Sequence, residues 1–129
     1  MRHGNLFVIS GPSGAGKGTL VARLLREIPD AWVSMSVTTR KPREGEVDGV
    51  HYRFASPEEF QELVDEDGLL EWATYGGNCY GTPRATVEEH IACGDQVILE
   101  IDVQGGFQVR DKFPSAHLVF IEPPSLDVL

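Results

Sequence analysis

The sequence of 129 residues has few cysteines, no long apolar run and fewer bases than acids. Its two cysteines, Cys79 and Cys93, form no C-x-x-C pair, which argues against a zinc site and favours free thiols in a reducing compartment. No apolar run approaches the about 20 residues that span a bilayer. The formal net charge of −9 opposes nucleic-acid binding, which needs a basic surface. We therefore expect a cytoplasmic protein that binds neither nucleic acid nor a membrane, and no sequence feature indicates an oligomeric state.

The charge is unevenly distributed along the chain. Residues 44–71 contain ten of the 20 acidic side chains and a single basic one, Arg53. Directly before this segment lies a compact basic cluster, Arg40, Lys41 and Arg43. In a strongly acidic chain such a cluster is well placed to bind an anion, although a charged run is also typical of a solvated surface.

A glycine-rich segment, residues 11–18, lies between an apolar run and a helical pattern that extends from Leu20 to Ile28. The order strand, glycine-rich loop and helix is the context of a phosphate-binding loop. Backbone N–H groups and the helix N-terminus surround the anion there, and Lys17 adds a full positive charge. Gly18 departs from the Ser or Thr whose hydroxyl usually binds Mg²⁺, and Thr19 follows it. The alternative is a glycine-rich turn that only caps the helix.

The rest of the chain alternates short apolar segments with helical patterns. We expect strands over 5–10, 32–37, 50–55, 69–75, 79–81, 96–102 and a buried one over 117–121. Helices are expected over 17–27, from 57 to about 67, from 83 to 93, from about 106 to 112, and from 125. Ser56-Pro57 and Thr82-Pro83 each read as an N-cap followed by proline in the first turn, while Gly105-Gly106 interrupts the chain.

These elements predict an α/β fold, a P-loop NTPase-type parallel sheet with helices on both faces. An inserted small α+β subdomain is expected over residues 35–82, with the P-loop core formed by residues 1–34 and 83–129. Asp102 ends the predicted strand 96–102, where the second acid of a phosphate-transfer site would lie, and Glu100 is expected on the same strand face. Either acid could instead simply cap the strand end.

Taken together, several motifs in the same order resemble guanylate kinase of the bacterial type. They are residues 10–19, 36–46, 49–52, 70–73, 77–82, 101–105 and 120–125. The resemblance implies transfer of the γ-phosphoryl group of ATP to GMP with Mg²⁺, in purine nucleotide metabolism. It also implies an ATP-binding loop formed by Gly11, Pro12, Ser13, Gly14, Ala15, Gly16, Lys17, Gly18 and Thr19.

The same resemblance assigns the acceptor site. It implies that Arg40 and Arg43 hold the GMP phosphate together with the hydroxyls of Tyr52 and Tyr80, and that Glu71 reads guanine. The full set of residues expected to bind GMP is Ser36, Arg40, Arg43, Tyr52, Glu71, Tyr80, Gly81, Thr82 and Asp102. For Thr82 the role of helix N-cap is an equal alternative.

The expected catalytic residues are Lys17, Arg40 and Asp102, and Asp102 is also the expected protein ligand for Mg²⁺, since Gly18 has no hydroxyl. The family domain continues past residue 129 into a lid with further arginines, so residues 1–129 alone are expected to have little or no kinase activity. Two alternatives are a non-catalytic guanylate-kinase-like binding module, which we would expect to lack Lys17, and a P-loop kinase for another nucleoside monophosphate.

Overall fold

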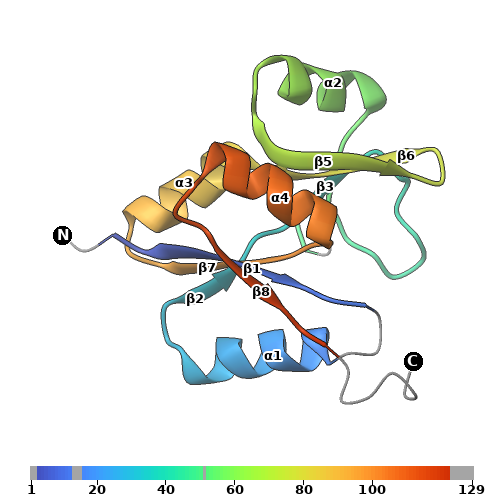
Figure 1. Ribbon diagram of the computed structural model, residues 1–129. Coiled ribbons are helices and arrows are strands. Elements are labelled where there is room, and N and C mark those ends of the chain that lie inside the picture. The colour runs from blue at the N-terminus through green and yellow to red at the C-terminus, as the bar shows by residue number, and fades with distance from the viewer. Residues whose placement is uncertain (1–2, 13–15, 51, 123–129) are drawn as a thin grey trace. The chain divides into compact units, whose positions relative to one another are not determined.

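The computed structural model describes residues 3–12, 16–50 and 52–122, and it divides into two compact units. The first unit contains Met1–Val33 and Glu88–Leu129, and the second contains Ser34–Val87. Each unit has its own four-stranded sheet (Figure 1). Among the residues described, no helix has the length and apolar character that crossing a bilayer would require.

The first unit is built on a parallel sheet with the strand order β2-β7-β1-β8. Strand β1 (Asn5–Ser10) pairs with β7 (Gln96–Glu100) and β8 (His117–Phe120), and β7 also pairs with β2 (Ala31–Val33). Helix α1 (Lys17–Glu27) covers one face, while α4 (Val103–Lys112) and the end of α3 (Arg84–Ala92) cover the other (Figure 1). The predicted parallel α/β sheet with helices on both faces is therefore confirmed.

Strand β1 contributes to the core on both faces of this sheet. Leu6 and Val8 are each 1% exposed, while Ile9 packs with Val21 of α1 and Ile98 of β7 on the other face. Burying each such aliphatic side chain contributes roughly 1.5–3 kcal/mol to stability.

The two glycines that were predicted to interrupt the chain instead lie inside α4. A Cβ at Gly106 would approach Val8 Cγ1 to 3.3 Å, so a side chain there would crowd the helix against the sheet. Close helix-to-sheet packing therefore explains a glycine pair that looks like a helix breaker in the sequence.

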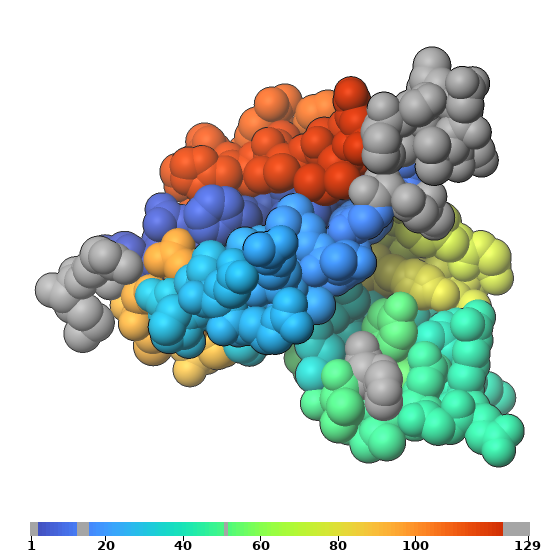
Figure 2. Space-filling view, turned by 90° about the horizontal axis from the view of Figure 1, so that it is seen from below, coloured from blue at the N-terminus to red at the C-terminus, as the bar shows by residue number. Residues whose placement is uncertain are grey.

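The prediction of a buried strand over 117–121 is wrong. Strand β8 is at the edge of the sheet and pairs with β1, and its apolar side chains Leu118, Val119 and Phe120 are 37%, 38% and 53% exposed. Val119 also lines a largely apolar groove of about 500 Å³ with Leu20 and Leu24 of α1. Figure 2 views this side of the first unit, with α1 at the front in blue and the segment that includes β8 in red. Apolar composition therefore indicates a strand here but not its burial.

The second unit is a mixed sheet with the order β4-β3-β6-β5. Strands β5 (Leu69–Tyr75) and β6 (Asn78–Pro83) form an antiparallel hairpin, and β3 (Val37–Thr38) joins β6 to β4 (Arg53–Phe54). The hairpin turn contains Gly76 and Gly77, whose φ angles of 57° and 81° favour glycine.

Helix α2 (Pro57–Asp65) lies in the second unit and begins as predicted. The Ser56 hydroxyl accepts from Glu59 N, and the Glu59 carboxylate accepts from Ser56 N, which completes a capping box. Phe60 of this helix packs with Val37 and Leu69 in the core of the unit.

Three further predictions differ from the structure. The strand expected over 32–37 is two strands, β2 in the first unit and β3 in the second, and the strand over 50–55 is reduced to β4. Thr82 does not cap a helix, because Thr82 and Pro83 belong to β6 and α3 begins at Arg84. The Thr82 hydroxyl donates across the hairpin to Glu71, a long-range partner that local sequence does not reveal.

Candidate functional site

The described part of the glycine-rich loop lies between β1 and α1, as the sequence predicts. A Cβ at Gly11 would lie 2.5 Å from the Ile121 carbonyl oxygen, and Gly16 has a left-handed φ of 92° at the N-cap of α1. Both positions therefore require glycine. The Lys17 ammonium donates to the Gly11 carbonyl over 3.1 Å. This hydrogen bond holds the positive charge of Lys17 next to the first residue of the loop.

The remaining residues of this loop are placed as follows. Pro12, Gly18 and Thr19 are exposed, and the last two lie in the first turn of α1. Ser13, Gly14 and Ala15, which were expected to bind ATP, lie outside the described residues. The first-turn amides of a helix point toward its N-terminus, which can bind an anion.

Two carboxylates, Glu100 and Asp102, lie at the C-terminal end of β7 and just after it, and they belong to different elements. Glu100 is the last residue of β7, and a Cβ placed at Gly18 would lie 4.0 Å from its Oε1 atom. Asp102, expected at the strand end, is instead the N-cap of α4 and accepts from Gly105 N over 2.7 Å. The prediction that both acids lie on one strand is therefore wrong. Within residues 3–12, 16–50 and 52–122, no group of three His, Cys, Asp or Glu side chains forms a metal site.

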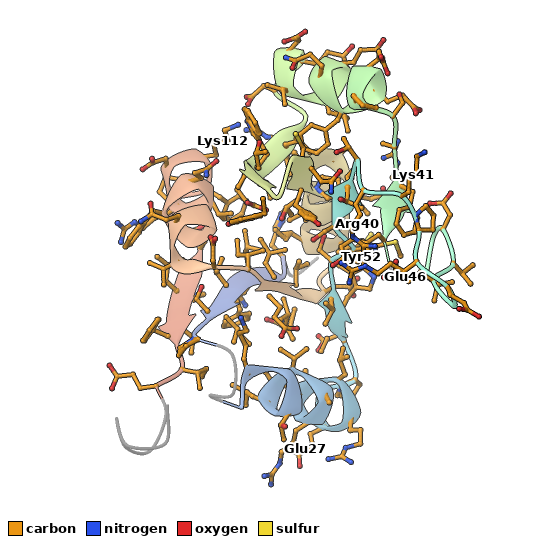
Figure 3. The ribbon with its side chains drawn as sticks, turned by 90° about the vertical axis from the view of Figure 1, so that its right-hand side faces the viewer. Glu27, Arg40, Lys41, Glu46, Tyr52 and Lys112 are labelled. Atoms are coloured by element: carbon orange, nitrogen blue, oxygen red, sulfur yellow. The ribbon has the colours of Figure 1, made fainter. Side chains whose placement is uncertain are left out.

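Arg40 of the second unit is the centre of a polar and aromatic cluster (Figure 3). Its guanidinium forms a bidentate pair with Glu46, with Nη1–Oε1 at 2.9 Å and Nη2–Oε2 at 3.0 Å. The Arg40 Cζ atom lies 5.2 Å from the centroid of the Tyr52 ring, close enough for a cation–π contact. The rings of Tyr52 and Tyr80 are 6.3 Å apart, and Tyr75 stacks on Tyr80 at 5.9 Å.

The Arg40–Glu46 pair shifts the pKa of both groups. The hydrogen bond from Arg40, followed by one from the Arg43 backbone N–H, lowers the pKa of Glu46 to about 2. The pKa of Arg40 is raised above its ordinary value, first by the Glu46 hydrogen bond and further by the hydroxyls of Tyr80 and Tyr52. The pair is therefore ionised throughout the neutral range.

The structure brings some of the expected GMP-binding residues together and leaves others apart. Arg40, Tyr52 and Tyr80 form one cluster. Arg43 is exposed and joins it through its backbone N–H, which donates to Glu46 Oε1 over 2.7 Å. Ser36 is half-buried, and its carbonyl accepts from Arg53 N over 3.0 Å.

Glu71 and Thr82 form a second polar group, within the β5–β6 hairpin. They face each other across the two strands and are 7% and 2% exposed, and the Thr82 hydroxyl donates to Glu71 Oε1 over 2.8 Å. Gly81 has a packing role here, because a Cβ would lie 3.0 Å from the Glu71 carbonyl oxygen and 3.0 Å from Leu69 Cδ1. A carboxylate this well buried is uncommon unless it is paired or functional.

Four functional candidates in the second unit were missed in the sequence. Glu46 was counted only among the acids, and Tyr75 only as a strand residue. Thr38 and Thr39 hold the start of the loop after β3: the Thr38 hydroxyl donates to the Cys79 carbonyl over 2.9 Å, and the Thr39 hydroxyl accepts from Cys79 N over 2.9 Å. These partners are about 40 residues apart in sequence, so no local pattern could have identified them.

Comparison with known proteins shows which family shares this arrangement. The guanylate kinase family model matches residues 3–129. Guanylate kinase of Desulfitobacterium hafniense is 56% identical over 98% of the chain and 64% of its own length. That of Gloeobacter violaceus is 57% identical over 96% and 60%. A crystal structure of guanylate kinase from Anaplasma phagocytophilum matches with a TM-score of 0.76 and 35% identity, over 99% of this chain and 64% of that one. The chain thus spans less than two thirds of these three proteins, and it belongs to the guanylate kinase family.

Proposed function

We propose that the protein containing these residues transfers the γ-phosphoryl group of ATP to GMP, producing ADP and GDP. Its family membership supports a nucleoside monophosphate kinase, and the free thiols support a cytoplasmic setting. One observation carries the choice of acceptor, namely the buried Glu71 carboxylate hydrogen-bonded to Thr82. A carboxylate accepts hydrogen bonds only, and guanine offers N1–H and a 2-amino group side by side, whereas adenine offers no such pair of donors.

The loop between β1 and α1 is the proposed ATP-phosphate site. Gly11 and Gly16 allow the tight backbone path, and the N-terminus of α1 contributes the positive end of its dipole. Lys17 places its charge over the loop and would stabilise the negative charge of the transferring phosphoryl group. Pro12, Ser13, Gly14, Ala15, Gly18 and Thr19 complete the proposed loop site.

Mg²⁺ is the proposed cofactor, and the carboxylates near the loop fit it because oxygen ligands suit this ion. Gly18 offers no hydroxyl, but Glu100 Oε1 lies 4.0 Å from the position that a side chain at Gly18 would start from. Glu100 would therefore hold the ion together with ATP oxygens, and Asp102 is the second proposed ligand. When bound, Mg²⁺ neutralises charge on the β- and γ-phosphate oxygens.

The Arg40 cluster is the proposed site for the GMP phosphate. A guanidinium matches phosphate geometry, and Arg40 has the hydroxyls of Tyr52 and Tyr80 around it. Arg43 is on the same loop and would supply a second cation. Orientation of the acceptor oxygen by this cluster would make Arg40 a catalytic group as well as a binding group.

The remaining proposed GMP contacts lie around the base and ribose. Thr82 orients the Glu71 carboxylate and adds its own hydroxyl, and Gly81 keeps the hairpin close-packed beside them. Ser36 and Asp102 are proposed as polar contacts to the nucleoside. A buried carboxylate that accepts from both guanine donors discriminates strongly against other bases, because a base without these donors leaves part of its hydrogen-bonding capacity unused.

Titration of the full-length protein with GMP and AMP tests this proposal. We expect GMP to bind at least about a hundredfold more tightly than AMP, since discrimination by buried hydrogen bonds reaches this level. Equal affinity would contradict the guanine-reading role of Glu71. A coupled assay of ADP release should show turnover with GMP, while tight GMP binding without turnover would indicate a binding module.

A further inference from the structure

The loop that carries Arg40 contains a carboxylate in close contact with it. Glu46 binds the Arg40 guanidinium through both oxygens, at 2.9 and 3.0 Å. The side chains of Arg40 and Glu46 are only 12% and 20% exposed, so this is not an ordinary surface ion pair. A carboxylate beside a phosphate-binding arginine repels the phosphate, so its presence needs an explanation.

We propose that Glu46 is a positioning residue that holds Arg40 in the orientation needed to bind the acceptor phosphate. This inference rests on the proposed role of Arg40 in GMP binding. It assigns Glu46 no contact with the substrate. Its effect would act entirely through the guanidinium.

The donor geometry of Arg40 allows both partners at once. A guanidinium has five N–H donors in a fixed plane. Glu46 engages Nη1 and Nη2, and the Lys41 carbonyl accepts from Nη1 over 3.2 Å. None of these bonds uses Nε. The hydroxyls of Tyr80 and Tyr52 also interact with the guanidinium. The edge formed by Nε–H and the second Nη2–H can therefore face a phosphate together with these hydroxyls while Glu46 holds the opposite end.

Glu46 is itself fixed to the loop, which argues against a carboxylate that leaves when phosphate arrives. Its Oε1 atom accepts from Arg43 N over 2.7 Å, and its own N–H donates to the Arg43 carbonyl over 2.9 Å. Moving the Glu46 side chain away would break the Arg43 N–H bond as well as both bonds to Arg40.

The other end of Arg40 is also fixed. Its backbone N–H donates to the Thr38 hydroxyl over 3.1 Å, and that hydroxyl donates to the Cys79 carbonyl. The Tyr52 ring lies beside the guanidinium at 5.2 Å. A long side chain held at its base, its face and its end loses little further freedom on binding, which favours affinity.

If Glu46 positions Arg40, its replacement weakens GMP binding, whereas if Glu46 only repels the phosphate, its replacement strengthens GMP binding. Three variants of the full-length protein separate these two possibilities. Glu46→Gln removes the charge and one acceptor, Glu46→Asp keeps the charge but shortens the reach, and Glu44→Gln removes an exposed charge from the same loop as a matched control. The measurements are GMP affinity by calorimetry, KM for GMP and for ATP, kcat, and the midpoint of thermal unfolding.

We expect Glu46→Gln and Glu46→Asp each to raise the Kd and KM for GMP about tenfold or more, with the KM for ATP unchanged. Glu44→Gln should match the parent protein. Because Glu46→Asp retains the negative charge, a loss of affinity in that variant isolates geometry from charge. An unchanged unfolding midpoint excludes a general loss of structure, and if Glu46→Gln fails to fold, Glu46→Asp alone decides the question.

Unchanged or tighter GMP binding in a folded Glu46 variant would overturn the inference. That result would mean that the carboxylate competes with phosphate or plays no part in binding. Failure of the proposed function would look different, because the parent protein itself would then show no preference for GMP.

Discussion

The two units organise their candidate sites in different ways. In the first unit the site is made from backbone geometry at strand ends, with Gly11 and Gly16 shaping one loop between β1 and α1. In the second unit it is made from side chains that meet across strands or across a loop, such as Glu71 with Thr82 and Arg40 with Glu46. The comparison teaches that a contiguous motif specifies the first kind of site, whereas the second kind depends on tertiary pairing.

The strongest test of this contrast is at Lys17. Lys17→Ala should lower kcat of the full-length protein by on the order of 10²–10³, because it removes the charge that we propose stabilises the transferring phosphoryl group. GMP affinity measured by calorimetry should stay within about twofold of the parent value. A large loss of GMP affinity would show that the two sites are not separable in the way we propose.

Glu71→Gln tests the side-chain site with a smaller expected effect. The amide cannot accept from both guanine donors, so the Kd for GMP should rise roughly 10- to 100-fold while AMP binding barely changes. Calorimetric titration with both nucleotides measures this selectivity. Loss of AMP and GMP binding in equal measure would instead indicate a collapsed hairpin.

Gly81→Ala tests how much the close packing around the β5–β6 hairpin contributes to the stability of the second unit. The added Cβ would lie 3.0 Å from the Glu71 carbonyl oxygen and 3.2 Å from Phe60 Cζ, which should lower the free energy of unfolding by about 1–3 kcal/mol. Urea unfolding measures the change. Gly77→Ala is not an equivalent control because of its left-handed φ of 81°. Gly18→Ala should have little effect on stability, because the added Cβ would lie 4.0 Å from Glu100 Oε1.

The smallest expected effect is the pH dependence that Glu46 gives to stability. Its pKa falls from 4.5 to about 2 on folding, so the folded state binds fewer protons than the unfolded state between these values. The stabilisation is complete above pH 4.5 and is lost as the pH falls toward 2. Urea unfolding at pH 6 and pH 3.5 should show a larger loss in the parent than in Glu46→Gln. Equal losses in the two proteins would contradict the lowered pKa.

Much of the fold and part of the site follow from the sequence. The P-loop context, the capping box at Ser56 and the parallel sheet depend on local signals, and all three appear in the structure. Burial of β8 was predicted wrongly, because an edge strand can be as apolar as a central one. Thr82 was assigned to a helix cap because its strand partner, Glu71, is 11 residues away and invisible to local rules.

The Arg40 cluster shows the same limit in a loop. Residues 40–46 have no periodicity, so their composition predicts a basic cluster followed by acids but not which acid binds which base. Glu46 rather than the nearer Glu44 engages Arg40, because the turn that brings Glu46 N to the Arg43 carbonyl also brings its side chain back toward Arg40. The left-handed Gly45, with a φ of 85°, makes that turn possible.

The attachment of this loop to Cys79 has a consequence for local unfolding. The Cys79 carbonyl accepts from the Thr38 hydroxyl and from Thr39 N, and its N–H donates to the Thr39 hydroxyl. One residue of β6 thus carries three bonds to the segment that precedes Arg40. Deuterium exchange at the Cys79 amide should therefore report the opening of the segment that contains Thr38 and Thr39, and the labelling rate of the half-buried Cys79 thiol gives a second measure of the same opening.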